Sequence, residues 1–144
     1  MFRVGIIGSE NSHAMAFSEI FNLSGKYDDI QVVAIYGEDE EASKKISEKC
    51  GVPMMKPEEM LGKVDAIMVT SRNGKFHPGY ARPFIEAGLP AFLDKPIAND
   101  GKEAEEIIAL ARAKGVPVMG GSSTKSVKDT LGLKAVADAA KAEG

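Results

Sequence analysis

A carboxylate and an ammonium follow a short apolar run in the sequence FLDKPIAND, residues 92–100. In an open parallel sheet, ligands bind beyond the carboxyl ends of the strands, so side chains that directly follow a strand are candidates for chemistry. Lys95 could hydrogen-bond a substrate oxygen or exchange a proton with it. The alternative is a surface ion pair of Asp94 and Lys95 beside a turn shaped by Pro96.

A second candidate site follows the first apolar run, in VGIIGSENSHA, residues 4–14. A glycine directly after a strand lets the backbone approach a pyrophosphate, whose charge is stabilised by the N-terminus of the next helix. Gly8 fits this role, whereas Glu10 and His13 stand where the motif G-x-G-x-x-G has its other glycines. The alternative is a tight strand-to-helix turn capped by one of three polar residues, Ser9, Asn11 or Ser12.

Acidic residues follow the second apolar run, in the sequence IYGEDE, residues 35–40. In many dinucleotide sites an acid at the end of the second strand accepts the ribose hydroxyls. Gly37 occupies that position, so Glu38 is the nearest substitute. Three consecutive acids would repel a 2′-phosphate, which favours NAD and leaves NADP possible. The alternative is that these acids only begin the next helix.

These side chains need a scaffold, and the chain alternates short apolar runs with segments of helical period. This pattern is typical of βαβ units around a parallel sheet. We therefore predict an α/β fold: a doubly wound, Rossmann-like parallel sheet in three α/β/α layers. The predicted strands are 2–8, 30–36, 66–70, 91–93 and 117–119, with a further short strand at 52–55.

The predicted helices lie between these strands and mostly end at a glycine. Pro83 must lie near the first turn of the helix before Gly88 or kink it, because proline cannot donate the interior hydrogen bond. The last helix contains Gly132 and has Leu131, Val136 and Ala140 available for packing. The helices are 12–24 before Gly25, one that begins within 39–41 and ends at Gly51, one before Gly88, one from an Asn99 or Asp100 cap to Gly115, and 127–142.

Composition limits the class of protein. With 144 residues, 44% hydrophobic and 27% charged, the chain predicts one globular domain over 1–144. The net charge of -3 and the absence of a basic block argue against nucleic acid as a partner. Cys50 is the single cysteine, so neither an intrachain disulfide nor a metal site is expected. No segment has the length of a membrane span, and we expect a cytoplasmic protein.

Three stretches resemble the glucose-fructose oxidoreductase, inositol dehydrogenase and MocA-type family. They are RVGIIG, DAIMVTSRNGKFHPGYARPFIEAGLPAFLDKPIAND and EAEEIIALARAKGVPVMGGSS, and the resemblance that they support runs along nearly the whole chain. In the middle stretch, a strand ends in Thr70, His77 follows, and EAGLPAFLDKP closely follows the family pattern. Members typically carry E-K-P where this chain has Asp94-Lys95-Pro96.

The resemblance implies a Rossmann domain that binds NAD or NADP, with Lys95 as the active-site lysine. It places His77 near the nicotinamide or the substrate, with a helix cap as the alternative. In a divergent form of the turn, the side chains of Asn11, Ser12 and His13 would meet the cofactor or substrate. The cofactor-binding set that we predict is Gly8, Ser9, Asn11, Ser12, His13, Glu38, Thr70, Ser71, Asp94 and Pro96.

The chain also departs from the family pattern. Glu10 and His13 break the glycine motif, Gly37 lacks the acid, and the T-P-N-x-x-H spacing is lengthened, so Asn73 does not inherit the role of that asparagine. Family members continue into a second α/β domain that supplies most of the substrate pocket and the oligomer interface.

The chain is therefore expected to be the N-terminal part of a longer protein and to be inactive alone. The predicted function is the nucleotide-binding domain of an NAD(P)-dependent oxidoreductase that acts on a sugar, polyol or related hydroxy compound, with homo-oligomers possible through the second domain. The alternative is a non-catalytic Rossmann-fold binding or regulatory module.

Overall fold

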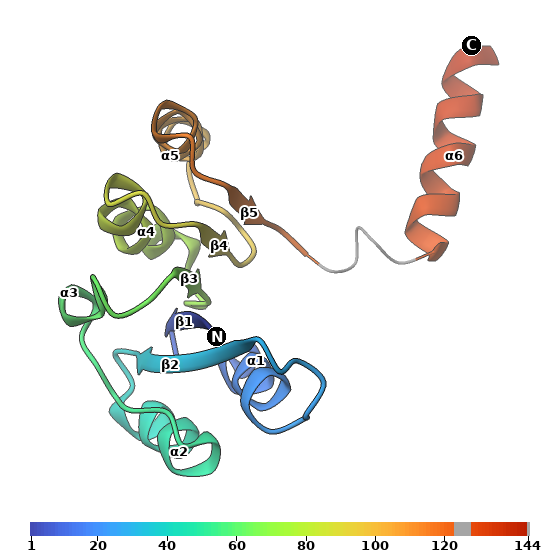
Figure 1. Ribbon diagram of the computed structural model, residues 1–144. Coiled ribbons are helices and arrows are strands. Elements are labelled where there is room, and N and C mark those ends of the chain that lie inside the picture. The colour runs from blue at the N-terminus through green and yellow to red at the C-terminus, as the bar shows by residue number, and fades with distance from the viewer. Residues whose placement is uncertain (123–127, 144) are drawn as a thin grey trace.

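The chain forms a five-stranded parallel sheet with the strand order β2-β1-β3-β4-β5. This architecture comes from a computed structural model, which describes residues 1–122 and 128–143 (Figure 1). Every neighbouring pair of strands runs parallel. The α/β fold class is confirmed. The strands are β1 (Phe2–Ile7), β2 (Ile30–Tyr36), β3 (Ala66–Val69), β4 (Ala91–Leu93) and β5 (Val118–Gly120).

Helices follow the strands, and three of them begin at the side-chain cap that their sequence favours. Asn11 accepts a hydrogen bond from the His13 amide, Asp39 from the Ala42 amide, and Asp100 from the amides of Lys102 and Glu103. The helices are α1 (Ser12–Asn22), α2 (Glu40–Cys50), α3 (Pro57–Met60), the 3-10 helix η1 (Gly74–Phe76), α4 (His77–Glu86), α5 (Gly101–Lys114) and α6 (Lys128–Glu143).

The sheet separates two apolar clusters, as the doubly wound arrangement requires. On one face, Ile67 and Leu93 pack with Phe84 of α4 and with residues of α3 and α5. On the other face, Ile6 packs with Ile46 of α2 and with residues of α1. In Figure 1, α4 and α5 lie on one side of the sheet and α1 on the other. Nearly continuous apolar strands are the expected result of burial on both faces.

Several predicted boundaries differ from the structure. β1 ends at Ile7 because Gly8 turns out of the strand with a φ of 108°. β3 ends at Val69, one residue before the predicted end, and β5 lies one residue later than predicted. α1 ends at Asn22, two residues before the predicted end. The short elements α3 and η1 were not predicted.

Pro83 lies inside α4, which excludes the first of the two predicted alternatives, a place near the first turn. Pro78 occupies the first turn, where the missing N–H would have no partner within the helix. The helix therefore begins earlier than a first-turn position for Pro83 would require.

The predicted strand at 52–55 is reduced to one parallel bridge between Ile35 and Met54. The Ile35 amide donates to the Pro53 carbonyl at 3.1 Å, and the Met55 amide donates to the Ile35 carbonyl at 2.9 Å. This bridge lies beyond β2 in the sheet. With it, the spatial order matches 3-2-1-4-5-6, the order of the dinucleotide-binding Rossmann fold.

The predicted last helix is present as α6 and stands apart from the sheet (Figure 1). Val136, which we expected to be available for packing, is 68% exposed, and Ala140 is exposed as well. The Leu131 side chain falls outside the described part of the structure. Within residues 1–122 and 128–143, no helix combines the length and apolar character needed to cross a membrane.

An ion pair joins the beginning of β1 to the residue before β3. Asp65 accepts hydrogen bonds from Arg3 Nη2 at 2.7 Å, from Nε at 3.0 Å and from the Arg3 amide at 2.8 Å. The hydrogen bonds and charge of Arg3 lower the pKa of Asp65 to about 2, from an ordinary value of 3.8. The carboxylate therefore stabilises the folded state wherever it is ionised.

We expect Asp65→Asn to lower the free energy of unfolding at neutral pH. Because the pKa of Asp65 is lowered on folding, its contribution is complete above about pH 4 and is lost as the pH falls toward about 2. Urea unfolding followed by circular dichroism measures the difference at each pH. Asp28→Asn, in an exposed loop, is the control. A difference that stays constant down to pH 2 would contradict the assignment.

Candidate functional site

The carboxyl ends of β1, β2, β3 and β4 meet at one edge of the sheet, with the polar residues that follow them. The chain order reverses between β1 and β3, which is the switch point where ligands bind in such sheets. The backbone is closely joined there. The Thr70 amide donates to the Ile7 carbonyl at 2.7 Å, and the Gly8 amide donates to the Tyr36 carbonyl at 2.7 Å.

Gly8 lies at this switch point, and glycine is required there by the neighbouring backbone. A Cβ at Gly8 would lie 2.1 Å from the Ser71 amide nitrogen, and the φ of 108° is itself unfavourable for other residues. The Thr70 hydroxyl donates to the Gly8 carbonyl at 2.9 Å. Thr70 and Ser71, both buried, thus hold the turn after β1 against the loop after β3.

Gly37 stands at the end of β2, where dinucleotide sites usually have an acid, because Ser9 leaves no room there for a side chain. A Cβ at Gly37 would lie 1.9 Å from Ser9 Oγ and 2.8 Å from the Ser9 amide nitrogen. The buried Ser9 hydroxyl lies 2.6 Å from the Ser43 hydroxyl and donates to the Asp39 carbonyl at 3.3 Å. The Ser9 side chain therefore joins the turn after β1 to the start of α2.

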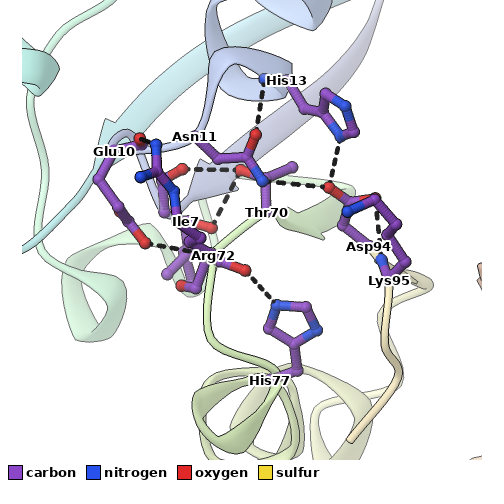
Figure 2. A network of polar contacts seen from close by, with 11 residues as sticks. Ile7, Glu10, Asn11, His13, Thr70, Arg72, His77, Asp94 and Lys95 are labelled. Carbon is purple, nitrogen blue, oxygen red and sulfur yellow. Dashed lines mark hydrogen bonds and ion pairs between the residues drawn. The ribbon is translucent and has the colours of Figure 1, made fainter.

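Asp94 is the centre of a polar network that joins the turn after β1 to the end of β4 (Figure 2). The His13 ring donates from Nδ1 to Asp94 Oδ2 at 2.6 Å, and the Asn11 side-chain amide donates to the same oxygen at 3.4 Å. The Lys95 amide donates to Oδ1 at 2.9 Å. Asp94 is 3% exposed, so these bonds compensate for the burial of its carboxylate.

Lys95 follows Asp94 and is exposed at the carboxyl end of β4. The structure does not show the alternative, an ion pair between the Lys95 ammonium and the Asp94 carboxylate. Asp94 binds the backbone of Lys95, and no ion pair of the Lys95 ammonium occurs among the described residues. The peptide bond to Pro96, itself exposed, is cis. Because no ion pair with the described residues occupies it, the Lys95 ammonium can meet a ligand at this edge.

His77 is fully buried as the first residue of α4. Its Nε2 lies 2.7 Å from the Ser71 carbonyl oxygen, which can only accept, so the ring donates from Nε2. The buried Nδ1 has no partner among the described residues. Through its bond to the Ser71 carbonyl, His77 thus fixes the loop after β3 to the start of α4 (Figure 2).

Sequence reasoning missed Arg72, which donates two hydrogen bonds to Glu10 across the switch point. The Arg72 amide donates to Glu10 Oε1 at 3.0 Å, and its Nη2 donates to the Glu10 carbonyl at 3.0 Å (Figure 2). The signal was the position of Arg72 within the segment that follows the third strand. Ser12, by contrast, is exposed in the first turn of α1.

Glu38 is exposed at the end of β2 and accepts hydrogen bonds from two tyrosines. The Tyr80 hydroxyl donates to Glu38 Oε1 at 2.7 Å, and the Tyr36 hydroxyl donates to the same oxygen at 3.3 Å. Burial and the bond to Glu38 raise the pKa of Tyr80, which keeps this phenol a donor. The other carboxylate oxygen, Oε2, accepts no hydrogen bond from the described residues and can accept one from a ligand hydroxyl.

A cavity of about 240 Å³ lies between these groups, at the carboxyl ends of β1, β2 and β3. Its lining combines the glycine turn, two carboxylates, one guanidinium and three aromatic rings. Arg72 is the one cation in this lining, which is fully within the described residues. The lining residues are Gly8, Glu10, Tyr36, Gly37, Glu38, Ser71, Arg72, Asn73, Phe76 and Tyr80.

The cavity fits a nucleotide better than it fits a metal ion. Within the part of the chain that the structure describes, no cluster of three or more His, Cys, Asp or Glu side chains could hold a metal. A nucleotide would find aromatic faces, a carboxylate for hydroxyl groups and a guanidinium for phosphate. The fold and the cavity together define a dinucleotide-binding domain of the Rossmann class.

The chain belongs to the Gfo/Idh/MocA family, an oxidoreductase family with an NAD-binding Rossmann fold. The family model matches residues 2–122. Inositol 2-dehydrogenase 1 of Saccharopolyspora erythraea is 28% identical over 118 residues, which cover 78% of this chain and 34% of that protein. The NADP-dependent scyllo-inositol 2-dehydrogenase of Bacillus subtilis is 27% identical over 138 residues, with 93% and 40% covered.

A solved structure has the same fold. The putative myo-inositol dehydrogenase of Sinorhizobium meliloti superposes with a TM-score of 0.74 at 18% identity, over 84% of this chain and 36% of that one. The chain thus spans 34% to 40% of the length of the curated relatives it matches.

Proposed function

We propose that this chain is the nucleotide-binding part of an NAD(P)-dependent oxidoreductase that acts on a polyol or related sugar, such as an inositol. The observation that carries the proposal is the cavity at the β1–β3 switch point, with Lys95 at the end of the next strand. The inositol dehydrogenases among the relatives support this substrate class.

The cavity would receive the adenosine and diphosphate part of the cofactor. Glu38 would accept bonds from the ribose hydroxyls while Tyr80 fixes its other oxygen. The diphosphate would lie above Gly8, near the exposed Ser12 and the Arg72 guanidinium. Because Glu10 and Glu38 both line the cavity, a further phosphate on the ribose would meet like charge, which favours NAD over NADP.

The chemistry would take place at the end of β4. When bound, the cofactor would supply hydride transfer to or from the substrate carbon. The amine of Lys95 would take the proton that leaves the substrate hydroxyl and would return it in the reverse direction. Asp94, His13 and Asn11 would hold the backbone of Lys95 in position. The buried His77 would position Ser71 and Thr70 at the edge of the nicotinamide pocket.

Calorimetric titration with NAD, NADH, NADP and NADPH tests the proposal directly. Calorimetry suits this chain because it contains no Trp for fluorescence. We expect saturable binding, with the pair that lacks the 2′-phosphate preferred. Binding of none of the four would contradict the nucleotide site and would favour a binding or regulatory module instead.

Glu10→Gln and Arg72→Gln are expected to move NAD affinity in opposite directions. Removing the Glu10 carboxylate should strengthen binding, and removing the Arg72 guanidinium should weaken it, each by about 1 kcal/mol or about fivefold in Kd. Both changes preserve the bond from the Arg72 amide to residue 10, because glutamine also offers an oxygen. Titration of each variant with NAD gives the two values.

Glu86→Gln and Arg112→Gln serve as charge-matched controls. Both residues lie in the last turns of their helices, α4 and α5, which place them near the opposite edge of the sheet. If Glu10→Gln weakened binding as much as Arg72→Gln, the two residues would support the turn without acting through charge.

A further inference from the structure

Two loops contact each other at the carboxyl edge of the sheet, the loop after β3 and the segment after β4. The loop after β3, residues 70–76, contributes Asn73 and Phe76 to the lining of the cavity at the switch point. The segment after β4, residues 95–99, begins with Lys95. None of its residues is among those that line the cavity, all of which the structure describes. The cavity and the lysine therefore belong to different loops.

The contact is made by a pair of asparagines and by a glycine that lies against a proline ring. The Asn99 side-chain amide donates to Asn73 Oδ1 at 3.0 Å, and the Lys75 backbone amide donates to the same oxygen at 3.0 Å. Gly74 is buried, and a Cβ there would lie 2.6 Å from Pro96 Cγ and 2.8 Å from Asn99 Oδ1. The two loops thus approach more closely than any side chain at position 74 would allow.

Asn73 can act on both sides of this contact. Its Oδ1 accepts two bonds from N–H groups, which fixes the orientation of the side-chain amide. Its Nδ2 has no acceptor among the described residues, and Asn73 lines the cavity, so Nδ2 can donate to a ligand there. A ligand that binds Nδ2 would hold the same side chain that accepts the bond from Asn99.

The segment after β4 carries Lys95 between two fixed ends. The Asp94 carboxylate accepts from the Lys95 amide at 2.9 Å (Figure 2), and the Asp100 side chain caps α5. Between these ends, the Pro96 ring lies against Gly74 of the other loop. Close-packed groups transmit a displacement to one another, so a movement of the loop after β3 reaches the residue that follows Lys95.

We propose that the contact between these two loops couples the cavity to Lys95, so that a bound nucleotide sets the position of the lysine. The bond from Asn73 Nδ2 to the nucleotide favours the arrangement in which Asn73 also holds Asn99. Asn73 and Asn99 are thus positioning residues, which act through Lys95 and do not touch the reacting atoms. The inference rests on the proposed function of the cavity and of Lys95.

Titration with AMP, followed by NMR of the backbone amides of the whole chain, tests the coupling. AMP carries the adenosine and one phosphate but no nicotinamide, so it has no group for the end of β4. We expect shifts at residues 72–76, and also at Lys95 and Ile97, which do not line the cavity. In Asn99→Ala, the shifts at residues 72–76 should remain, and those in the segment after β4 should be lost.

Lys102→Ala is the matched control, because it removes an exposed side chain in the first turn of α5, close to Asn99 in the chain. It should keep every shift. If AMP shifted residues 72–76 but not Lys95 in the unchanged chain, the coupling would be wrong and the nucleotide site would stand. The same holds if Asn99→Ala kept the Lys95 shift. No shift at any residue would overturn the nucleotide site and the coupling with it.

Gly74→Ala tests the steric part of the contact without a ligand. The added Cβ would displace the Pro96 ring, so the Lys95 amide resonance should move. Gly79→Ala, within α4, is the control, because a Cβ at Gly79 meets nothing within 4 Å. A Lys95 resonance that Gly74→Ala left unchanged would show that the contact does not position the lysine.

A kinetic measurement on the complete gene product separates positioning from general support of the structure. Asn99→Ala should lower kcat for polyol oxidation by about 10- to 100-fold, the range expected for a misplaced reacting group. In combination with Lys95→Ala it should cause no further loss, because a positioning residue acts only through the lysine. A further loss of the same size in the double variant would contradict the proposal.

Discussion

Lys95→Ala is expected to lower kcat for polyol oxidation by about 10²- to 10⁴-fold, the range for loss of a general acid or base. Lys95 lies at the carboxyl end of β4, and its ammonium has no ion-pair partner among the described residues. Without its amine, the substrate hydroxyl would have to lose its proton to water. NAD affinity should change little, because the proposed nucleotide contacts lie at β1, β2 and β3.

The measurement uses the complete gene product, with myo-inositol and scyllo-inositol as first substrates and reduced nicotinamide absorbance as the signal. Lys95→Arg keeps the positive charge but exchanges protons poorly, so it should restore little activity. Lys114→Ala, in the last turn of α5, is the control. If Lys95→Ala retained full activity, another group would have to carry the proton.

Gly8→Ala is expected to destabilise the domain by about 3 kcal/mol or more. The added Cβ would lie 2.1 Å from the Ser71 amide nitrogen and 2.7 Å from the Thr70 carbonyl carbon. These are backbone atoms of a buried loop, and the Thr70 and His77 side chains both hold that loop in place. Neither segment can move away without breaking those bonds.

Urea unfolding followed by far-ultraviolet circular dichroism measures this change. Gly25→Ala separates the two causes, because Gly25 also has a positive φ, 63°, but a Cβ there meets nothing within 4 Å. It should cost only about 1 kcal/mol. Equal losses for the two variants would show that backbone conformation, and not the contact with Ser71, explains the requirement for glycine.

Much of the fold was predictable because its signals are local. The strands are short apolar runs bounded by polar residues, and α2 and α5 begin at the Asp39 and Asp100 caps that the sequence favours. Pro83 shows the limit of such signals. Whether a proline begins a helix or lies inside it depends on how the preceding residues pack, and α4 begins six residues earlier, at His77.

The sequence predicted which positions form the candidate site, but it did not predict most of the contacts that their side chains make. Strand ends indicated which residues gather at the edge of the sheet, and the resemblance to the family singled out Lys95 and His77. The contacts differ from the simplest expectation. Ser9 bonds within the protein, His77 is buried, and Arg72 was missed although it follows a predicted strand.

The sequence alone determined the alternation of strands and helices, the helix caps and the membership of residues in the strand-end loops. These properties depend on neighbours within one or two turns of the chain. Only the tertiary structure decided that His13 meets Asp94, 81 residues away, and that Glu10 meets Arg72, 62 residues away. Such contacts depend on the strand order, which brings β1 between β2 and β3, and no local pattern specifies that order.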